Sequence, residues 1–127
     1  MRVLQGYNRM NNFSIGCDIE EISRFEGKTL ENDAKFLAKI FTQNELNYSF
    51  QSKNYASHLC ARFCAKEAIV KALSEFDITD VYYSDIEIQN KKSGAPCAKI
   101  AKYPDIEIKI SLSHSKTNAM ASVILIK

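Results

Sequence analysis

Glu67 is the side chain whose place in the sequence most clearly calls for a chemical explanation. Residues 54–74 contain no proline or glycine, and their apolar side chains recur at intervals of three and four. On a helix of about 100° per residue, Ala56, Cys60 and Phe63 fall within about 40° of Glu67. A buried carboxylate must be protonated, paired or metal-bound. Two explanations are open: an ion pair with Lys71, which general experience favours, or a metal ligand with Lys71 beside it.

Asp18 is a second carboxylate of interest, because a predicted strand passes into a predicted helix there. Asp18 and Glu21 have the D-x-x-E spacing of a capping box, so N-capping is the default interpretation. The alternative is a magnesium site that Asp18 shares with Glu67. Mg²⁺ is commonly held by one or two carboxylates together with water and substrate phosphates.

Residues suited to phosphate binding lie in two places. His114 stands among Ser111, Ser113 and Ser115 at the end of a predicted strand. Their side chains can donate hydrogen bonds to phosphate oxygens, although a lone histidine in a turn is usually just solvated. The predicted long helix carries a basic set, Arg62, Lys66 and Lys71. A solvated face is the ordinary explanation of such a set, and its closeness to Glu67 is the reason to consider a site.

A second basic set precedes the long helix and consists of Arg24, Lys28, Lys35 and Lys39. Solvated side chains are the default interpretation, because exposed ion pairs contribute little to stability. The alternative is a docking surface for a strongly acidic partner.

Periodicity predicts the elements that must position these residues. It indicates a short strand over residues 15–19, a helix starting near Asp18, a helix around residues 36–40 and another that begins at the T-x-x-E capping box of Thr42. The long helix follows over about 54–74. Alternation then predicts strands over residues 85–89, 106–112 and 119–126, with a turn at 92–96. Helices followed by a mostly antiparallel sheet indicate an α+β fold.

Length and composition are those of one ordinary globular domain. The chain has 127 residues, of which 46% are hydrophobic and 25% charged, and its net charge is +2. We expect a single domain over residues 14–127 after a polar extension, residues 1–13, within which Met10 is a possible start. No apolar run approaches the roughly 18 residues of a membrane span. The small net charge argues against a nucleic-acid partner.

The four cysteines form no C-x-x-C pair. Cys60 and Cys64 lie one helical turn apart and close to His58, so a metal site is conceivable. Buried, reduced thiols are the better explanation, because free cysteine packs as a small hydrophobe. Reduced thiols and the lack of a signal sequence favour a cytoplasmic location.

Five motifs resemble those of the holo-acyl-carrier-protein synthase family. Residues 15–25, IGCDIEEISRF, resemble its G-x-D-I-x-E-I-x-R signature, and residues 41–45, FTQNE, resemble F-T-x-x-E. Residues 61–73, ARFCAKEAIVKAL, are similar to its most diagnostic segment, R-F-A-A-K-E-A-x-x-K-A. Gly94–Pro96 stands where G-K-P is usual, and residues 111–114, SLSH, resemble S-[IL]-[ST]-H. Order and spacing agree over residues 14–126.

The resemblance implies the 4′-phosphopantetheinyl transferase fold, with helices that include one long helix packed on a mostly antiparallel sheet. It also implies a reaction in which 4′-phosphopantetheine passes from coenzyme A (CoA) to a serine of apo-acyl carrier protein, with adenosine 3′,5′-bisphosphate as second product. Mg²⁺ would be held by Asp18, Glu67 and the CoA pyrophosphate. Glu67, directly or through water, would accept the serine proton, and Lys71 would stabilise the developing charge.

The resemblance also implies binding roles. Contacts to CoA would come from Arg62, Lys66, Lys71, Pro96, Ser113 and His114. The helix after Asp18 would meet the acidic carrier protein through Arg24, with Lys28 as an additional candidate. Bacterial family members are typically homotrimers with CoA in the cleft between subunits. The Gly94–Pro96 turn and the final strands would then face a neighbouring copy.

The chain departs from the family pattern in two places, and the first of them motivates an alternative function. The segment Ser74–Asp77 replaces a Gly-Thr-Gly loop, and its acidic side chains would repel phosphate if they pointed inward. The predicted carrier-docking helix also contains Glu26 and Glu31. The alternative is a non-catalytic relative of the same fold that binds CoA or carrier protein without turnover.

Overall fold

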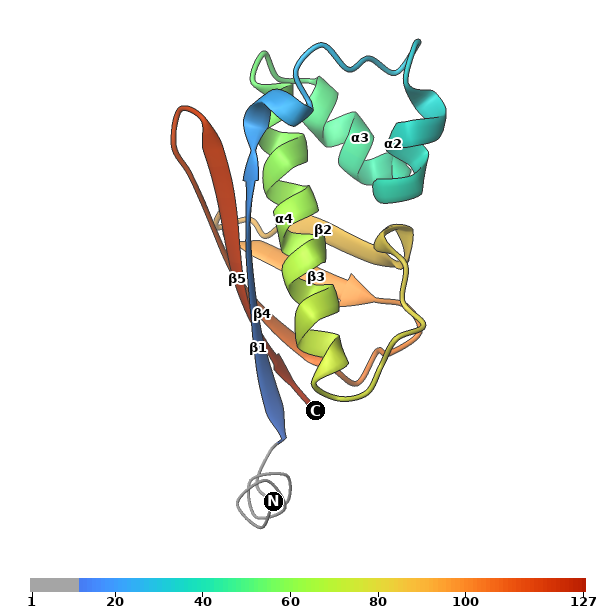
Figure 1. Ribbon diagram of the computed structural model, residues 1–127, viewed down its shortest axis with the longest axis vertical. Helices are drawn as coiled ribbons and strands as arrows, with labels where there is room; N and C mark the ends of the chain where they lie inside the picture. Colours follow the sequence, from blue (N-terminus) through green and yellow to red (C-terminus); the bar gives the residue numbers. More distant parts are fainter. Residues whose placement is uncertain (1–11) are drawn as a thin grey trace.

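Helix α4 (Tyr55–Ser74) is the central element of the fold, and the other elements lie on two sides of it (Figure 1). The structure is a computed structural model that describes residues 12–127. Before α4 come β1 (Phe13–Glu21), the 3₁₀ turn η1 (Ile22–Arg24), α2 (Ala34–Ile40) and α3 (Gln43–Phe50). After it come the 3₁₀ turn η2 (Tyr83–Asp85), β2 (Ile86–Asn90), β3 (Pro96–Ile100), β4 (Glu107–His114) and β5 (Asn118–Ile126).

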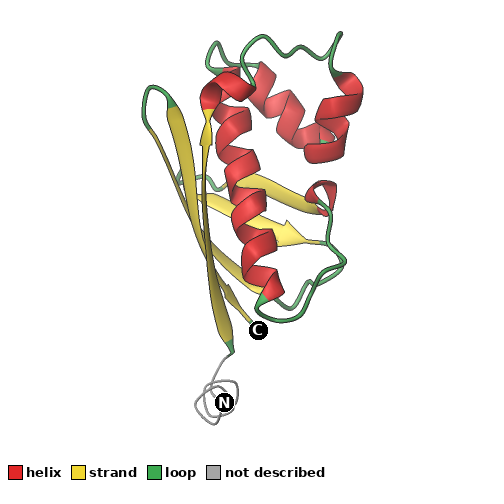
Figure 2. Cartoon of the chain, viewed as in Figure 1, coloured by secondary structure: helices red, strands yellow, loops and turns green. Residues whose placement is uncertain are grey.

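The strands form two antiparallel sheets on opposite sides of α4 (Figure 2). The larger sheet has the order β1-β5-β4, so the first and last strands of the chain are neighbours, in a register that runs from Phe13 opposite Ile126 to Glu21 opposite Asn118. The smaller sheet is the hairpin β2–β3. The predicted α+β class with antiparallel strands is confirmed.

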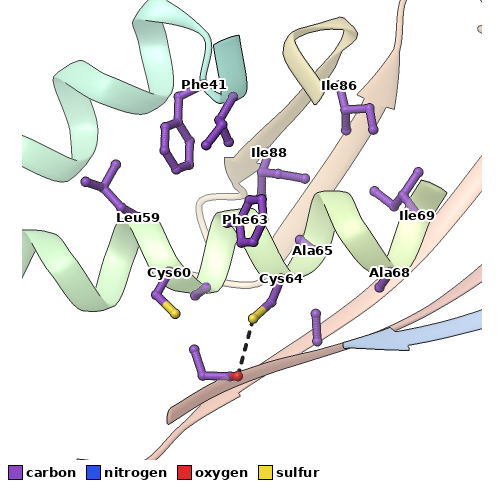
Figure 3. Close-up of a cluster of buried hydrophobic side chains, with 14 of the residues drawn as sticks. Phe41, Leu59, Cys60, Phe63, Cys64, Ala65, Ala68, Ile69, Ile86 and Ile88 are labelled. Carbon is purple, nitrogen blue, oxygen red and sulfur yellow. Dashed lines mark hydrogen bonds between the residues drawn. The ribbon is translucent and has the colours of Figure 1, made fainter. Parts of the chain in front are cut away.

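The core surrounds α4 because both layers bury it. Leu59, Phe63 and Ile69 of α4 are at most 3% exposed, and they pack with Phe41, Ile88 and other side chains (Figure 3). A helix covered from two sides loses the polar face that a surface helix keeps. Among residues 12–127, no helix is both long and apolar enough to cross a bilayer.

The predicted buried thiols are confirmed. Cys60 and Cys64 are fully buried and free, and the Cys64 thiol donates a hydrogen bond to the Ala119 carbonyl at 3.3 Å (Figure 3). In the described part of the chain, no group of three His, Cys, Asp or Glu side chains is placed to hold a metal ion. The conceivable cysteine–histidine metal site is therefore not formed there.

The predicted helices and strands agree with the structure in most places. The capping box at Thr42 is present, since the Thr42 hydroxyl accepts from the Glu45 amide and the Glu45 carboxylate accepts from the Thr42 amide. The hairpin turn at residues 92–96 is present too, whereas β3 after it was not predicted. Its five residues, PCAKI, show too little alternation of polar and apolar side chains to indicate a strand.

The helix predicted to begin near Asp18 is wrong. Strand β1 continues to Glu21, and only the three-residue turn η1 follows. Asp18 lies inside the strand, opposite Ala121 of β5, so it caps no helix. Ladder pairing along the whole of β1 overrides the helical spacing of Ile19 and Ile22, because each residue gains a partner on β5.

The predicted extension, residues 1–13, lies mostly outside the described residues. Its last two residues are described: Phe13 begins β1, and the carbonyl of Asn12 accepts a hydrogen bond from the Lys127 amide at 2.9 Å.

Candidate active site

A close approach of β1 to α4 sets the position of Asp18. A Cβ atom on Gly16 would lie 2.1 Å from the carbonyl oxygen of Ala68, so only glycine allows this packing. Two residues earlier, the buried Ser14 hydroxyl donates to the Ala72 carbonyl at 2.8 Å. Because β1 side chains alternate, Asp18 points to the same face as Ser14 and Gly16 and therefore toward α4.

Asp18 and Lys71 form the ion pair at this contact. The Lys71 ammonium lies 3.2 Å from Asp18 Oδ1 and donates to the Cys17 carbonyl at 3.0 Å. The hydrogen bond to Asp18 raises the pKa of Lys71. The predicted pair between Lys71 and Glu67 is therefore replaced by one across the β1–α4 contact, and no ion pair of Glu67 is found among residues 12–127.

The other oxygen of Asp18 fits a cation. Asp18 Oδ2 is buried and has no hydrogen-bond partner. A buried carboxylate oxygen without a donor is costly, and a bound cation would remove that cost. Asp18 is therefore a suitable ligand for a metal ion at this point.

Glu67 is connected with this site by its effect on the pKa of Tyr83. Burial, followed by a hydrogen bond to Glu67, raises the pKa of Tyr83 to about 12, and the charges of Asp18 and Glu20 add to the shift. The charges of both Asp18 and Glu67 also raise the pKa of Lys71. The two carboxylates predicted as metal ligands therefore act on the same two groups. A site with two carboxylates leaves its remaining positions to water and phosphate, as Mg²⁺ prefers.

Lys66 lies in the core rather than at a phosphate-binding surface. Its ammonium is fully buried, 2.7 Å from Glu45 Oε1, and it donates to the carbonyls of Ile40, Tyr83 and Ile86. Burial lowers the pKa of Lys66, while Glu45 opposes that shift. The Glu45 carboxylate and the three carbonyls together occupy all the donors of the ammonium. Lys66 therefore connects α2, α3, η2 and β2 to α4, and its ammonium has no donor left for a CoA phosphate. The solvated basic face considered for this helix is wrong at this position.

Arg62 faces a cavity of about 340 Å³ beside the N-terminal half of α4. Pro96 and His114 line the same cavity, so three of the residues implied for CoA binding meet here. Arg62 is only 4% exposed, its guanidinium stacks on Tyr48 with 4.3 Å between the Cζ atom and the ring centroid, and its Nε has no partner. A buried guanidinium with a free donor is suited to bind an anion.

Ser113 and His114 are adjacent at the end of β4, so their side chains point to opposite faces of the sheet. Their alternation sends His114 into the cavity of Arg62, while Ser113 is opposite Met120 on the open face of the sheet. Both residues line a neighbouring hollow of about 330 Å³ that also includes Ile19. The structure therefore brings Ser113 beside the Arg62 cavity and not into it.

The predicted carrier-docking residues lie around η1. Arg24 is half exposed, pairs with Glu20 at 2.7 Å and stacks on Phe63 at 4.9 Å. Lys28 stacks on the exposed ring of Phe36. The predicted docking helix is a short 3₁₀ turn followed by a loop, yet both cations remain near the surface.

The segment Ser74–Asp77 ends α4 in a Schellman motif. The amides of Ile78 and Asp77 donate to the carbonyls of Leu73 and Ser74, at 3.1 and 3.0 Å. Asp77 has a φ of 60°, the left-handed conformation for which glycine is usual. Its backbone thus follows the turn of a glycine-containing loop while its carboxylate remains exposed.

Comparison with known proteins identifies the family. The sequence pattern of the 4′-phosphopantetheinyl transferase superfamily matches residues 14–124. The chain belongs to this superfamily. A holo-[acyl-carrier-protein] synthase of Oceanobacillus iheyensis is 40% identical, with 87% of this chain and 93% of the relative covered. The synthase of Thermodesulfovibrio yellowstonii is 38% identical, with 87% and 96% covered.

Solved phosphopantetheinyl transferases have the same fold. A holo-(acyl-carrier-protein) synthase of Bacillus anthracis, in complex with CoA (3′,5′-ADP), superimposes with a TM-score of 0.73 at 33% identity, covering 90% of this chain and 96% of that one. The Helicobacter pylori enzyme, in complex with coenzyme A, gives 0.73 at 28% identity, covering 87% and 98%. The resemblance found in the sequence motifs is confirmed.

Three further side chains near these groups had no part in the transferase site predicted from the sequence. Glu20 lies near the Asp18 carboxylate, the charge of Asp18 contributes to the raised pKa of Tyr83, and His58 lines the Arg62 cavity. Glu20 could have been found from the sequence, since residues two apart on a strand share a face. Tyr83 gave no such signal, because its neighbours come from distant segments, and His58 was considered only for a metal site with Cys60 and Cys64.

Proposed function

We propose that this transferase moves the 4′-phosphopantetheine group of CoA to a serine hydroxyl of apo-acyl carrier protein, with adenosine 3′,5′-bisphosphate as the second product. The observation that carries the proposal is the ion pair of Asp18 and Lys71 where β1 crosses α4, with the charge of Glu67 acting on the same lysine. These residues come from the two motifs most typical of the family. The curated relatives, named as holo-[acyl-carrier-protein] synthases, agree with it.

Asp18 and Glu67 would hold Mg²⁺. The support is the buried, unpartnered Oδ2 of Asp18 and the shared influence of both carboxylates on Lys71 and Tyr83. When bound, the ion neutralises charge on the phosphorus under attack and on the leaving phosphate.

The chain's own groups move the proton and stabilise the charge. The serine oxygen forms a bond to the β-phosphorus of CoA while the bond from that phosphorus to the bridging oxygen breaks. Glu67 accepts the proton that the serine hydroxyl loses. The Lys71 ammonium, charged and half exposed, stabilises the negative charge of the departing bisphosphate. Glu67 also raises the pKa of Tyr83, which places the two side chains near each other.

CoA would contact Arg62, Pro96 and His114 in the 340 Å³ cavity and Ser113 beside it. Arg62 and Lys71 are nine positions apart on α4, about 13 Å along the helix axis. The Arg62 cavity and the reacting centre at Asp18 and Lys71 are therefore separate surfaces of one copy. A cleft between two copies would let each copy supply one of these surfaces.

A homotrimer is part of the proposal, and the open face of the larger sheet supports it. Ile15 and Ile124 are opposite each other on β1 and β5 and are 69% and 43% exposed, and the pair Ile19 and Met120 repeats the pattern at 63% and 42%. A hollow of about 730 Å³ lies over part of this face. Large apolar side chains exposed together on one sheet face are typical of a protein interface.

The carrier protein would dock on the surface around η1. Arg24 and Lys28 supply positive charge, and exposed Leu30 and Phe36 supply apolar contacts next to them. A cytoplasmic location completes the proposal. It is supported by the four free cysteines, since thiols stay reduced in that compartment.

The decisive experiment incubates the protein with apo-acyl carrier protein, CoA and Mg²⁺ and then weighs the carrier by mass spectrometry. We expect a mass gain of one phosphopantetheine, its loss with EDTA, and its loss in Glu67→Gln. The matched control is Glu107→Gln, which neutralises an exposed carboxylate on β4.

Two results would contradict the proposal. No mass gain, with CoA still bound, would favour the non-catalytic relative and point to the Ser74–Asp77 segment as the cause. Undiminished transfer by the Glu67→Gln variant would disprove the assignment of the proton acceptor.

A further inference from the structure

The cavity of Arg62 is lined by basic and neutral side chains without a carboxylate. Besides Arg62 and His114, the lining includes a second imidazole, that of His58 on the preceding turn of α4. The turn between β2 and β3 contributes Asn90, Gly94 and Pro96, none of them charged. Three nitrogen-rich side chains thus face one cavity whose lining contains no carboxylate, and the charge of Glu45 acts on Arg62 from outside that lining.

Tyr48 of α3 holds two of these side chains in place. The Arg62 guanidinium lies over its ring at 4.3 Å, and the His58 ring meets it edge-on, with centroids 5.4 Å apart. The Tyr48 hydroxyl accepts a hydrogen bond from Asn90 at 2.9 Å, which anchors the ring. His58 is therefore an oriented group of the cavity rather than a freely rotating surface side chain.

The surroundings keep His58 neutral while the cavity contains no anion. Burial is the main cause that lowers the pKa of His58, and the charges of Arg62 and His114 lower it further. Tyr48, from α3, is the remaining titratable side chain of the lining. An anion that enters the cavity opposes the effect of the two cations, because it attracts the proton that they repel.

We propose that His58 is an additional phosphate-binding residue that takes up a proton when a phosphomonoester enters the Arg62 cavity, and that it thereby makes the enzyme prefer CoA over dephospho-CoA. The inference rests on the proposed function. CoA carries a diphosphate and a 3′-phosphomonoester, and its diphosphate must lie at Asp18 and Glu67, where it reacts. The 3′-phosphomonoester is the group left for the cavity. As a dianion with a second pKa near 6, it gains most from a charged imidazole.

The binding test uses adenosine 3′,5′-bisphosphate and 5′-AMP, which differ by that monoester and do not react. Calorimetry at pH 7 in two buffers of different ionisation enthalpy measures affinity and proton uptake. For His58→Phe, which keeps the ring contact with Tyr48, we expect affinity for the bisphosphate to fall about tenfold, affinity for AMP to stay the same, and proton uptake to disappear. His58→Gln is a second variant that keeps a hydrogen-bond donor without the proton.

The control is Lys53→Gln, which removes an exposed positive charge just before α4 and outside the cavity lining. It should bind both probes as the unmodified protein does. Equal losses for bisphosphate and AMP in the His58 variants, or unchanged proton uptake, would overturn the inference.

A transfer assay separates this inference from the proposed function. If the unmodified protein modifies the carrier and His58→Phe raises KM for CoA but not for dephospho-CoA, both hold. If transfer is normal and His58→Phe treats the two donors alike, the inference alone fails. If no transfer occurs at all, the proposed function fails, and the binding comparison still decides the role of His58.

Discussion

The Lys71 ammonium lies 3.2 Å from one oxygen of Asp18, while the other oxygen of Asp18 is buried without a partner. One carboxylate is thus shared between a lysine from α4 and an open coordination position. The lysine neutralises part of its charge, and the second oxygen remains available to a cation. A metal ion bound to that second oxygen would therefore compete with Lys71 for the charge of Asp18.

Replacement of Lys71 should separate its effect on the transition state from its effect on metal binding at Asp18. We expect Lys71→Met to lower kcat about 10²–10³-fold, as for other groups that stabilise charge in a transition state. Binding of Mg²⁺ should tighten, because Asp18 loses its cationic partner. Initial rates and calorimetry measure the two quantities. Lys99→Met, on the exposed side of β3, is the control, and an unchanged kcat in Lys71→Met would refute the role of this lysine.

The buried pair Lys66–Glu45 should control stability. Lys66→Met leaves the Glu45 charge buried, so we expect a loss of about 3–5 kcal/mol in the free energy of unfolding. Adding Glu45→Gln removes that charge and keeps an acceptor for the Thr42 and Ile88 amides, so the double variant should be more stable than Lys66→Met alone. Urea unfolding provides the measurement. The exposed Lys39→Met should change stability by less than about 0.5 kcal/mol. Equal stability of Lys66→Met and Lys39→Met would contradict the core role.

Tyr83 should lose its proton at a higher pH than an ordinary tyrosine. Its pKa is raised to about 12 by burial first and by Glu67 second, so tyrosinate absorbance should show a late component that Tyr83→Phe removes and Glu67→Gln shifts to lower pH. Between about pH 10 and 12 the unfolded chain loses this proton before the folded one. Stability should therefore fall as pH rises through this window, and less so in Tyr83→Phe. A late component that persists in Tyr83→Phe would assign it to another tyrosine.

Gly16 should not tolerate even a methyl group. In an ordinary strand, alanine for glycine is favourable by about 0.5–1 kcal/mol, but here the new Cβ would lie 2.1 Å from a backbone oxygen of α4. We expect Gly16→Ala to cost about 1–3 kcal/mol and to lower kcat, because Asp18 moves away from α4. Cys17→Ala, at the neighbouring exposed position, is the matched control for thermal unfolding and activity. A stabilised Gly16→Ala would show that β1 can shift freely.

The open sheet face should decide the state of association. Three chains of 14.4 kDa would give a particle of about 43 kDa in light scattering. Ile15→Asp should produce monomers and abolish transfer, since it places a charge among apolar side chains of β1 and β5. Leu30→Asp, at an exposed apolar position in the loop after η1, should leave the mass unchanged. Monomers before any substitution would refute the trimer.

Local interactions made much of this protein predictable from its sequence. The capping box of Thr42, the length of α4 and the strands β2, β4 and β5 all follow from spacing between residues close in the chain. Family membership was predictable too, because the motifs keep their residue types and order over most of the chain. Asp18 and Glu67 were recognisable as unusual carboxylates for the same reason.

Tertiary structure decided which of these residues meet. Asp18 is a strand residue because β1 pairs with β5, more than a hundred positions later, and sequence spacing carries no record of that pairing. Lys71 pairs with Asp18 across 53 positions rather than with Glu67 on the same helix, because Gly16 lets β1 approach α4 closely. Lys66 is buried although lysines are usually exposed, since Glu45 and three carbonyls surround its ammonium. Packing between distant segments determines such contacts.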